Sequence, residues 1–213
     1  MKTNDRQGQI LLRAGLWAAP LFIVSLLLFG ALTPGYSHLH KAVSRLGALG
    51  TPWGGWFGLL GFFVPGMLQT GVALELRRRL KTAGASTRWA TGLIIYTLML
   101  ALTAVPADFG RMFASPWTWA HTFFVMGSPL ILFTVIPGCA KALKTLGTPG
   151  GAVRIFYLLG YLPLVEFLLY GVLRDTPGLV QRLMILTAHA ALTWLAVILL
   201  KNGRGRSEAD ITP

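Results

Sequence analysis

The chain is short of acidic residues and has almost no cysteine. Asp and Glu account for 7 of its 213 residues and Lys and Arg for 19, and all charged residues together make up only 12%. Soluble domains carry about 25% charged residues, so this composition excludes an ordinary soluble domain. The single cysteine, Cys139, excludes a disulfide within the chain. Because 54% of the residues are hydrophobic, the sequence predicts a protein that lies in a lipid bilayer.

Six apolar stretches divide the chain, each about as long as a bilayer crossing. A spanning helix needs roughly 17 to 25 apolar residues, and the stretches that meet this length are 11–32, 56–76, 89–105, 121–140, 155–173 and 183–200. The bilayer offers no water to bond backbone groups, so these segments must be helical. We therefore predict an all-α, polytopic bundle of six transmembrane helices. It forms one domain over residues 11–200, with polar tails at 1–10 and 201–213.

The basic residues are distributed unevenly between the two sides of the predicted bundle. Fourteen of the 19 fall on the side of both tails, and five fall on the other side. This positive-inside pattern predicts that both termini are cytoplasmic and that the protein is a multi-pass protein of the cytoplasmic (inner) membrane. The net charge of +12 follows from this topology and from attraction to anionic membrane lipids. Membrane lipids are therefore the expected partners, and nucleic acid is not.

Two ionisable side chains lie deep inside predicted spans. Glu166 is seven residues from the outer end of its stretch, and His189 is six residues from the outer start of the last one. A rise of 1.5 Å per residue places them about 10 and 9 Å below the surface. An ionisable group at a helix centre costs at least about 2.5 kcal/mol unless a partner meets it. Consecutive antiparallel helices are neighbours, so we expect Glu166 and His189 to be within reach of each other.

Other polar residues gather on the same outer side. Asp108 follows the third stretch and His121 begins the fourth, and together with Glu166 and His189 they predict an outward-facing pocket with candidate catalytic groups. The alternative is that these side chains only form hydrogen bonds between helices. Four further outer-side residues are candidates for contact with a ligand: Ser44, Arg111, Tyr170 and Arg182.

Three classes of function remain open for this pocket. The first is binding of a small apolar or lipid-like molecule. The second is an enzyme that acts on a membrane lipid, either as a metal-dependent hydrolase or as an acid–base isomerase or cyclase. The third is a proton-coupled transporter. The histidines lack the HxxxH and HExxH spacings of zinc sites, so the spacing identifies neither a metal nor another cofactor.

Several short motifs resemble one family of prokaryotic membrane proteins, the domain of unknown function 998 family. The motifs are Tyr36-Ser37-His38, Ala42-Val43-Ser44-Arg45-Leu46-Gly47-Ala48, Arg77-Arg78-Arg79, Val105-Pro106-Ala107-Asp108 and the downstream His121. The resemblance covers most of the chain and implies six membrane helices, with no activity attached. It also singles out Ser44, Asp108 and His121 as site candidates.

Overall fold

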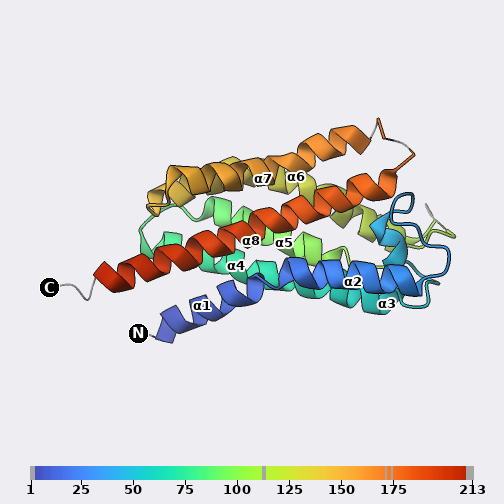
Figure 1. Cartoon of the computed structure of the whole chain (residues 1–213), viewed down its shortest axis with the longest axis horizontal. Coiled ribbons are helices and arrows are strands. Elements are labelled where there is room, and N and C mark those ends of the chain that lie inside the picture. The colour runs from blue at the N-terminus through green and yellow to red at the C-terminus, as the bar shows by residue number, and fades with distance from the viewer. Residues whose placement is uncertain (1–2, 112–113, 171, 174, 210–213) are drawn as a thin grey trace.

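The fold was described from a computed structural model, which covers residues 3–111, 114–170, 172–173 and 175–209; the side chains of residues 3–5, 170 and 203–209 are not described. The described chain consists of helices and loops (Figure 1). The elements, in order, are α1 (Thr3–Gly15), α2 (Ala18–Leu32), the 3-10 turn η1 (Val43–Gly47), α3 (Gly54–Phe57), the π-helical segment η2 (Gly58–Phe63), α4 (Val64–Thr82), α5 (Arg88–Leu102), α6 (Pro116–Thr145), α7 (Gly150–Tyr170) and α8 (Pro177–Ala209).

The helices confirm the predicted class, a helical membrane bundle. Five helical segments are long and apolar enough to cross a bilayer, and they cover residues 6–32, 54–82, 116–145, 150–169 and 177–202. The sixth, α5, is apolar but only 15 residues long. Helix is the expected state for all six because it satisfies every backbone group without water.

Both predicted tails are largely helical in the structure. The chain is helical from Thr3, and α1 packs against α4. At Gly8 the two helices are so close that a Cβ atom would lie 2.6 Å from a carboxyl oxygen of Glu75. At the other terminus, α8 continues through residues 201–209. The tail boundaries predicted from polarity therefore mark a change of surroundings and not the ends of helices.

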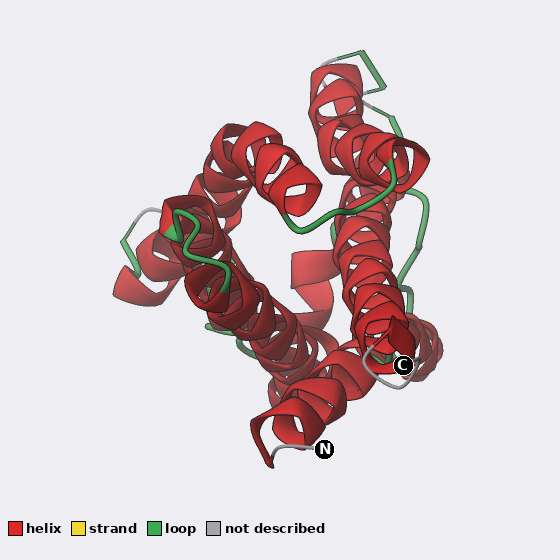
Figure 2. Cartoon of the chain, turned by 90° about the vertical axis from the view of Figure 1, so that its left-hand side faces the viewer, coloured by secondary structure: helices red, strands yellow, loops and turns green. Residues whose placement is uncertain are grey.

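The two ends of the bundle differ in what they carry. Both termini lie at one end, together with the short α4–α5 and α6–α7 connections (Figure 1); we call this the termini end. The opposite end carries the long α2–α3 connection, the α5–α6 connection and the α7–α8 connection, and we call it the loop end. Figure 2 views the chain from the termini end, along the direction of the helices.

Glycines allow the second membrane segment to approach α5 closely. A Cβ atom at Gly66 would lie 2.5 Å from the backbone nitrogen of Ala101, and one at Gly58 would lie 3.0 Å from the carbonyl oxygen of Ala104. Small residues at such contacts are typical of membrane helix pairs. The glycines therefore let this segment pack closely against α5 and the residues that follow it.

Candidate functional site

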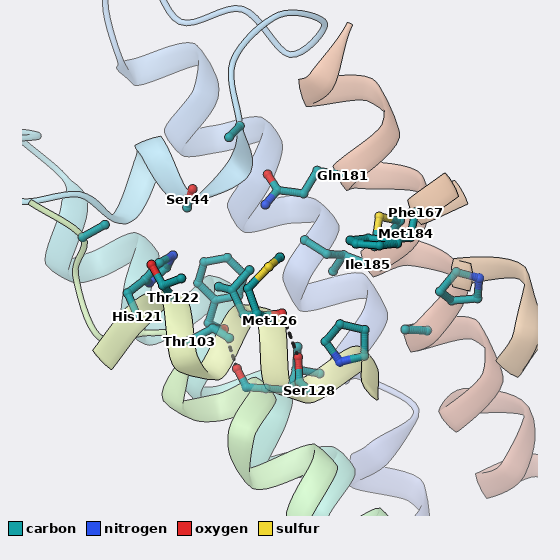
Figure 3. A pocket seen from close by; sticks show the side chains of 18 of the residues that line it. Ser44, Thr103, His121, Thr122, Met126, Ser128, Phe167, Gln181, Met184 and Ile185 are labelled. Carbon is teal, nitrogen blue, oxygen red and sulfur yellow. Dashed lines mark hydrogen bonds between the residues drawn. The ribbon is translucent and has the colours of Figure 1, made fainter. Parts of the chain in front are cut away.

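A cavity of about 460 Å³ lies in the loop-end half of the bundle, between α5, α6, α7 and α8. Figure 3 shows its lining, with Ser44 above and the α6 residues on one side. The lining is mostly apolar, and four of its residues are exposed: Trp119 by 59%, Met126 by 48%, Phe167 by 42%, and Thr122. Met126 and Phe167 lie inside the membrane-length helices α6 and α7, so the lining reaches the outer surface of the bundle between these helices. The volume lies within the roughly 300–1,000 Å³ that is usual for ligand pockets.

Prolines interrupt both α6 and α7 where these helices line the cavity. Pro129 and Pro163 are lining residues inside their helices. A proline inside a helix leaves the carbonyl four residues earlier without its backbone donor and favours a bend. The Ser128 hydroxyl donates to that carbonyl, at Val125, over 3.5 Å. Pro129 therefore interrupts the backbone hydrogen bonding of α6 beside the cavity, and Ser128 partly replaces the lost hydrogen bond.

His121 lies at this cavity, with one ring nitrogen bonded to the backbone. Its ring is 7% exposed and lies among the lining residues. Nδ1 lies 2.7 Å from the carbonyl oxygen of Val105. A carbonyl oxygen only accepts hydrogen bonds, so Nδ1 carries the proton, and in the neutral ring Nε2 then holds a lone pair.

Gln181 offers the complementary group from α8. The backbone N–H of Val43 lies 2.6 Å from its Oε1, and because an N–H can only donate, this contact fixes the orientation of the amide. The Nε2 group remains as a donor. Tyr96 and Ser44 also line the cavity, and no residue that the structure describes is hydrogen-bonded to their hydroxyls.

A segment of the α2–α3 connection, residues 36–44, which we call the strap, crosses the loop end of the cavity and is bonded to α8. The backbone N–H of Leu179 donates to Leu39 over 3.1 Å, and Nδ1 of His40 donates to the Asp175 carbonyl over 2.7 Å. The close approach of the strap to α8 requires a glycine at Gly178, because a Cβ atom there would collide with the Lys41 carbonyl. The strap therefore forms a roof fixed to the start of α8.

Arg182 is the main link between the strap and α8. The predicted loop from residue 174 to residue 182 ends earlier, because α8 begins at Pro177 and places Arg182 inside the helix. Its guanidinium donates to the Lys41 carbonyl at 3.0 Å, to His38 Nδ1 at 3.3 Å and to the Tyr36 hydroxyl. The side chain is 7% exposed, so its donors serve the strap, whereas the sequence suggested that they contact a ligand.

The strap side chains that contact Arg182 have shifted pKa values. Burial, and then the positive charge of Arg182, hold the pKa of His38 below its ordinary value. Burial raises the pKa of Tyr36, against the opposing effect of Arg182. Both shifts keep these two side chains neutral at pH 7, and a neutral His38 is the form that accepts the Arg182 hydrogen bond.

The structure corrects the expected contact between Glu166 and His189. Glu166, 6% exposed, accepts a hydrogen bond from the Thr187 hydroxyl at 2.8 Å, at the seam between α7 and α8. His189, 1% exposed, is hydrogen-bonded through Nδ1 to the Gln69 side chain of α4. Its ring also lies 5.1 Å from that of Phe22 in α2. The two ionisable groups therefore face different neighbours, and neither lines the cavity.

Asp108 and Arg111 do not line the cavity. Asp108 accepts hydrogen bonds from the backbone N–H groups of Gly110 and Arg111, each at 3.1 Å, and so shapes the α5–α6 connection. The Arg111 side chain is exposed. The side chain of Tyr170 lies outside the described residues. Of the eight sequence candidates, His121 and Ser44 are the two that the structure places on the cavity.

Two lining residues, Tyr96 and Gln181, were missed by reasoning from the sequence. Both are uncharged, and neither stands at a motif spacing. One signal was present: Gln181, Ile185 and Ala188 recur at i, i+4 and i+7 and therefore share one face of α8, and all three line the cavity. Over the residues described, no group of three His, Cys, Asp or Glu side chains is arranged to hold a metal ion.

Comparisons with known proteins give one match. The family model described as "Protein of unknown function (DUF998)" matches residues 16–198. No curated protein and no solved structure matches the chain. The matched region contains every residue that lines the cavity.

Proposed function

We propose that this chain, which belongs to the DUF998 family, binds one lipid-like molecule in the cavity between α5, α6, α7 and α8. The observation that carries the proposal is the cavity itself: about 460 Å³, mostly apolar, with exposed lining residues on the lipid-facing side. A site of this kind suits an apolar chain that arrives from the bilayer, because burial of its surface is favourable and needs no passage through water.

The proposal includes an orientation. Fourteen of the 19 basic residues belong to the side of the termini, so the positive-inside rule supports a cytoplasmic termini end and a loop end on the outer face of the inner membrane. In this orientation the cavity lies at the depth of the outer leaflet, and the strap separates it from the aqueous phase. A ligand would enter sideways from that leaflet, with its chain between the helices and its polar end beneath the strap.

One observation favours a second function, acid–base catalysis on the bound lipid. His121 presents the Nε2 lone pair beside the cavity, as a general base requires. The measurement that separates the two functions is the lipid profile of cells that carry His121→Ala. Catalysis predicts that a substrate lipid accumulates, whereas binding alone predicts an unchanged profile. A transporter built on a Glu166–His189 proton relay has less support, because these side chains have separate partners.

Native mass spectrometry of the protein purified in mild detergent tests the binding function. We expect one retained lipid-sized adduct on the wild-type chain and its loss in Ile185→Trp, which places a larger ring in the cavity. The matched control is Leu130→Trp, at a position of α6 that is 66% exposed to lipid. The control should keep the adduct.

The two variants also define the contrary result. Adducts that are equally abundant in the wild type, Ile185→Trp and Leu130→Trp would mean that lipid binds the outer surface and not the cavity, and would refute the proposal. Thermal melting of both variants identifies a misfolded protein, so that loss of the adduct through unfolding is recognised.

A further inference from the structure

We infer that the ligand carries an uncharged hydroxyl group at its polar end, as a long-chain alcohol or a monoacylglycerol does. This inference rests on the proposed function and adds the chemical class of the ligand. Three observations support it. The polar groups of the lining are uncharged, two of them have a fixed hydrogen-bonding orientation, and the nearest arginines already bond to other parts of the protein.

The cavity lining contains no formal charge in the part of the chain that the structure describes. The polar lining residues are all serine, threonine, tyrosine, histidine or glutamine. A phosphate or carboxylate buried in an apolar site needs a cationic partner to offset the loss of its hydration. A neutral head has no such requirement, and this lining can satisfy it with hydrogen bonds alone.

The arginines near the strap are engaged elsewhere. Arg182 donates to the strap and to the Gly178 carbonyl, which is 2.5 Å from Nη1. The guanidinium of Arg45 lies over the ring of Phe109, 4.5 Å from its centre, and its side chain is exposed at the surface. Neither residue belongs to the lining. Recruiting Arg182 for an anionic head would break its hydrogen bonds to the strap.

The two oriented groups have complementary roles. His121 offers a lone pair at Nε2, because the Val105 carbonyl takes the Nδ1 proton. Gln181 offers N–H donors at Nε2, because the Val43 N–H occupies its oxygen. A hydroxyl is at once a donor and an acceptor, so an alcohol can use both walls of the cavity. A carboxylate only accepts hydrogen bonds, and its charge would face the lone pair of His121.

The experiment uses two photoreactive probes on the full chain in detergent at pH 8. One is hexadecanol with a diazirine in its chain, and the other is the matching hexadecane, which lacks the hydroxyl. Monooleoylglycerol, oleate and dioleoylphosphatidylglycerol are then compared as competitors of the alcohol probe. We expect monooleoylglycerol to displace the probe at a concentration about fivefold or more lower than the other two require. This ratio corresponds to at least one net hydrogen bond.

Two variants measure how much the hydroxyl group of the alcohol probe contributes to binding. His121→Leu should weaken labelling by the alcohol probe about fivefold and leave labelling by the alkane probe unchanged. Thr134→Leu removes a polar group of α6 that bonds to the Ile131 carbonyl and does not line the cavity, and should change neither. Equal displacement by all three competitors, or alcohol labelling that is insensitive to His121→Leu, would overturn this inference alone. Failure of both probes to label the cavity would refute the proposed function instead.

Discussion

The termini end of the bundle is packed tightly, whereas the loop end encloses a cavity. At the termini end, a Cβ atom added at Gly138 would fall within the ring of Trp89, and Glu75 is 1% exposed between two arginines. At the loop end, α6 and α8 face each other across about 460 Å³ of space. The difference agrees with the proposed function, in which tight packing at one end stabilises the fold and the cavity at the other end holds the proposed ligand.

Among the variants that test this difference between the two ends, Glu75→Ala is expected to lower the free energy of unfolding the most. Arg78 and Arg79 donate to the Glu75 carboxylate at 2.6 and 2.8 Å, and Arg79 also bonds to the Leu199 carbonyl of α8. Removing a buried partner leaves charges uncompensated, so we expect a loss of about 3 kcal/mol in the free energy of unfolding. Thermal unfolding in detergent measures it.

Arg77→Gln is the control for this substitution. Arg77 bonds only to the exposed Thr91 hydroxyl among the described side chains, and a surface contact of this kind contributes about 0.5 kcal/mol or less. Equal melting temperatures of Glu75→Ala and the wild type would show that the termini end is not held together as described.

A smaller loss is expected from Gly138→Ala. The new methyl group would overlap the Trp89 ring, and the helices would have to separate, at a cost of about 2 kcal/mol. Gly151→Ala is the matched control, since nothing lies within 4 Å of a Cβ atom there. It should be neutral or slightly stabilising, because alanine favours the helix. If both variants melted alike, packing at the termini end would be looser than the structure indicates.

The stability of the strap should change with pH by about 1 kcal/mol or less, as expected for one hydrogen bond. The pKa of His38 is lowered on folding, so the unfolded chain binds more protons and the folded strap loses stability as the pH falls below about 6.5. Protonation also removes the lone pair that accepts the Arg182 hydrogen bond. Relative to the intrinsic exchange rate at each pH, hydrogen exchange of the Leu39 to Val43 amides should therefore accelerate on acidification.

His38→Gln and His40→Gln separate the effect of His38 protonation from a general destabilisation of the fold at low pH. An amide at position 38 does not titrate, so the acceleration should disappear. His40 donates through Nδ1 to a carbonyl and makes no contact with Arg182, so His40→Gln should leave the acceleration in place. Retention of the acceleration in His38→Gln would contradict the assignment.

Glu166→Gln is expected to have the smallest effect. The amide oxygen can still accept from Thr187, and hydrogen bonds between membrane helices contribute about 0.6 kcal/mol. Melting should therefore shift little, and labelling by the alkane probe should not change. A loss of labelling would place Glu166 in the site, which the lining residues do not indicate.

The sequence was sufficient for the helical class, because long apolar stretches in a bilayer must be helical. The rotation of a helix about its axis depends on which neighbours surround it, and α8 contacts α1, α2, α4 and α7. Thr187 and His189 lie roughly 200° apart around α8. A helix that presents Thr187 to Glu166 therefore turns His189 away from it.

The site itself was only partly predictable. His121 and Ser44 were identified from motifs, whereas the roles of Gln181 and His121 as donor and acceptor depend on backbone groups of Val43 and Val105 that come from distant parts of the chain. Arg182 shows the same limitation. An arginine near a membrane surface suggests a ligand contact, and only the fold shows that the strap occupies its donors.

The most direct test of the central claim is to map where the photoreactive hexadecane attaches in wild type and in Ile185→Trp. If the cavity binds the chain, adducts should concentrate at residues 122–129 of α6 and 181–188 of α8, and Ile185→Trp should abolish them. Adducts spread over lipid-exposed positions such as Leu130 and Leu158, with the same pattern in Ile185→Trp, would contradict it.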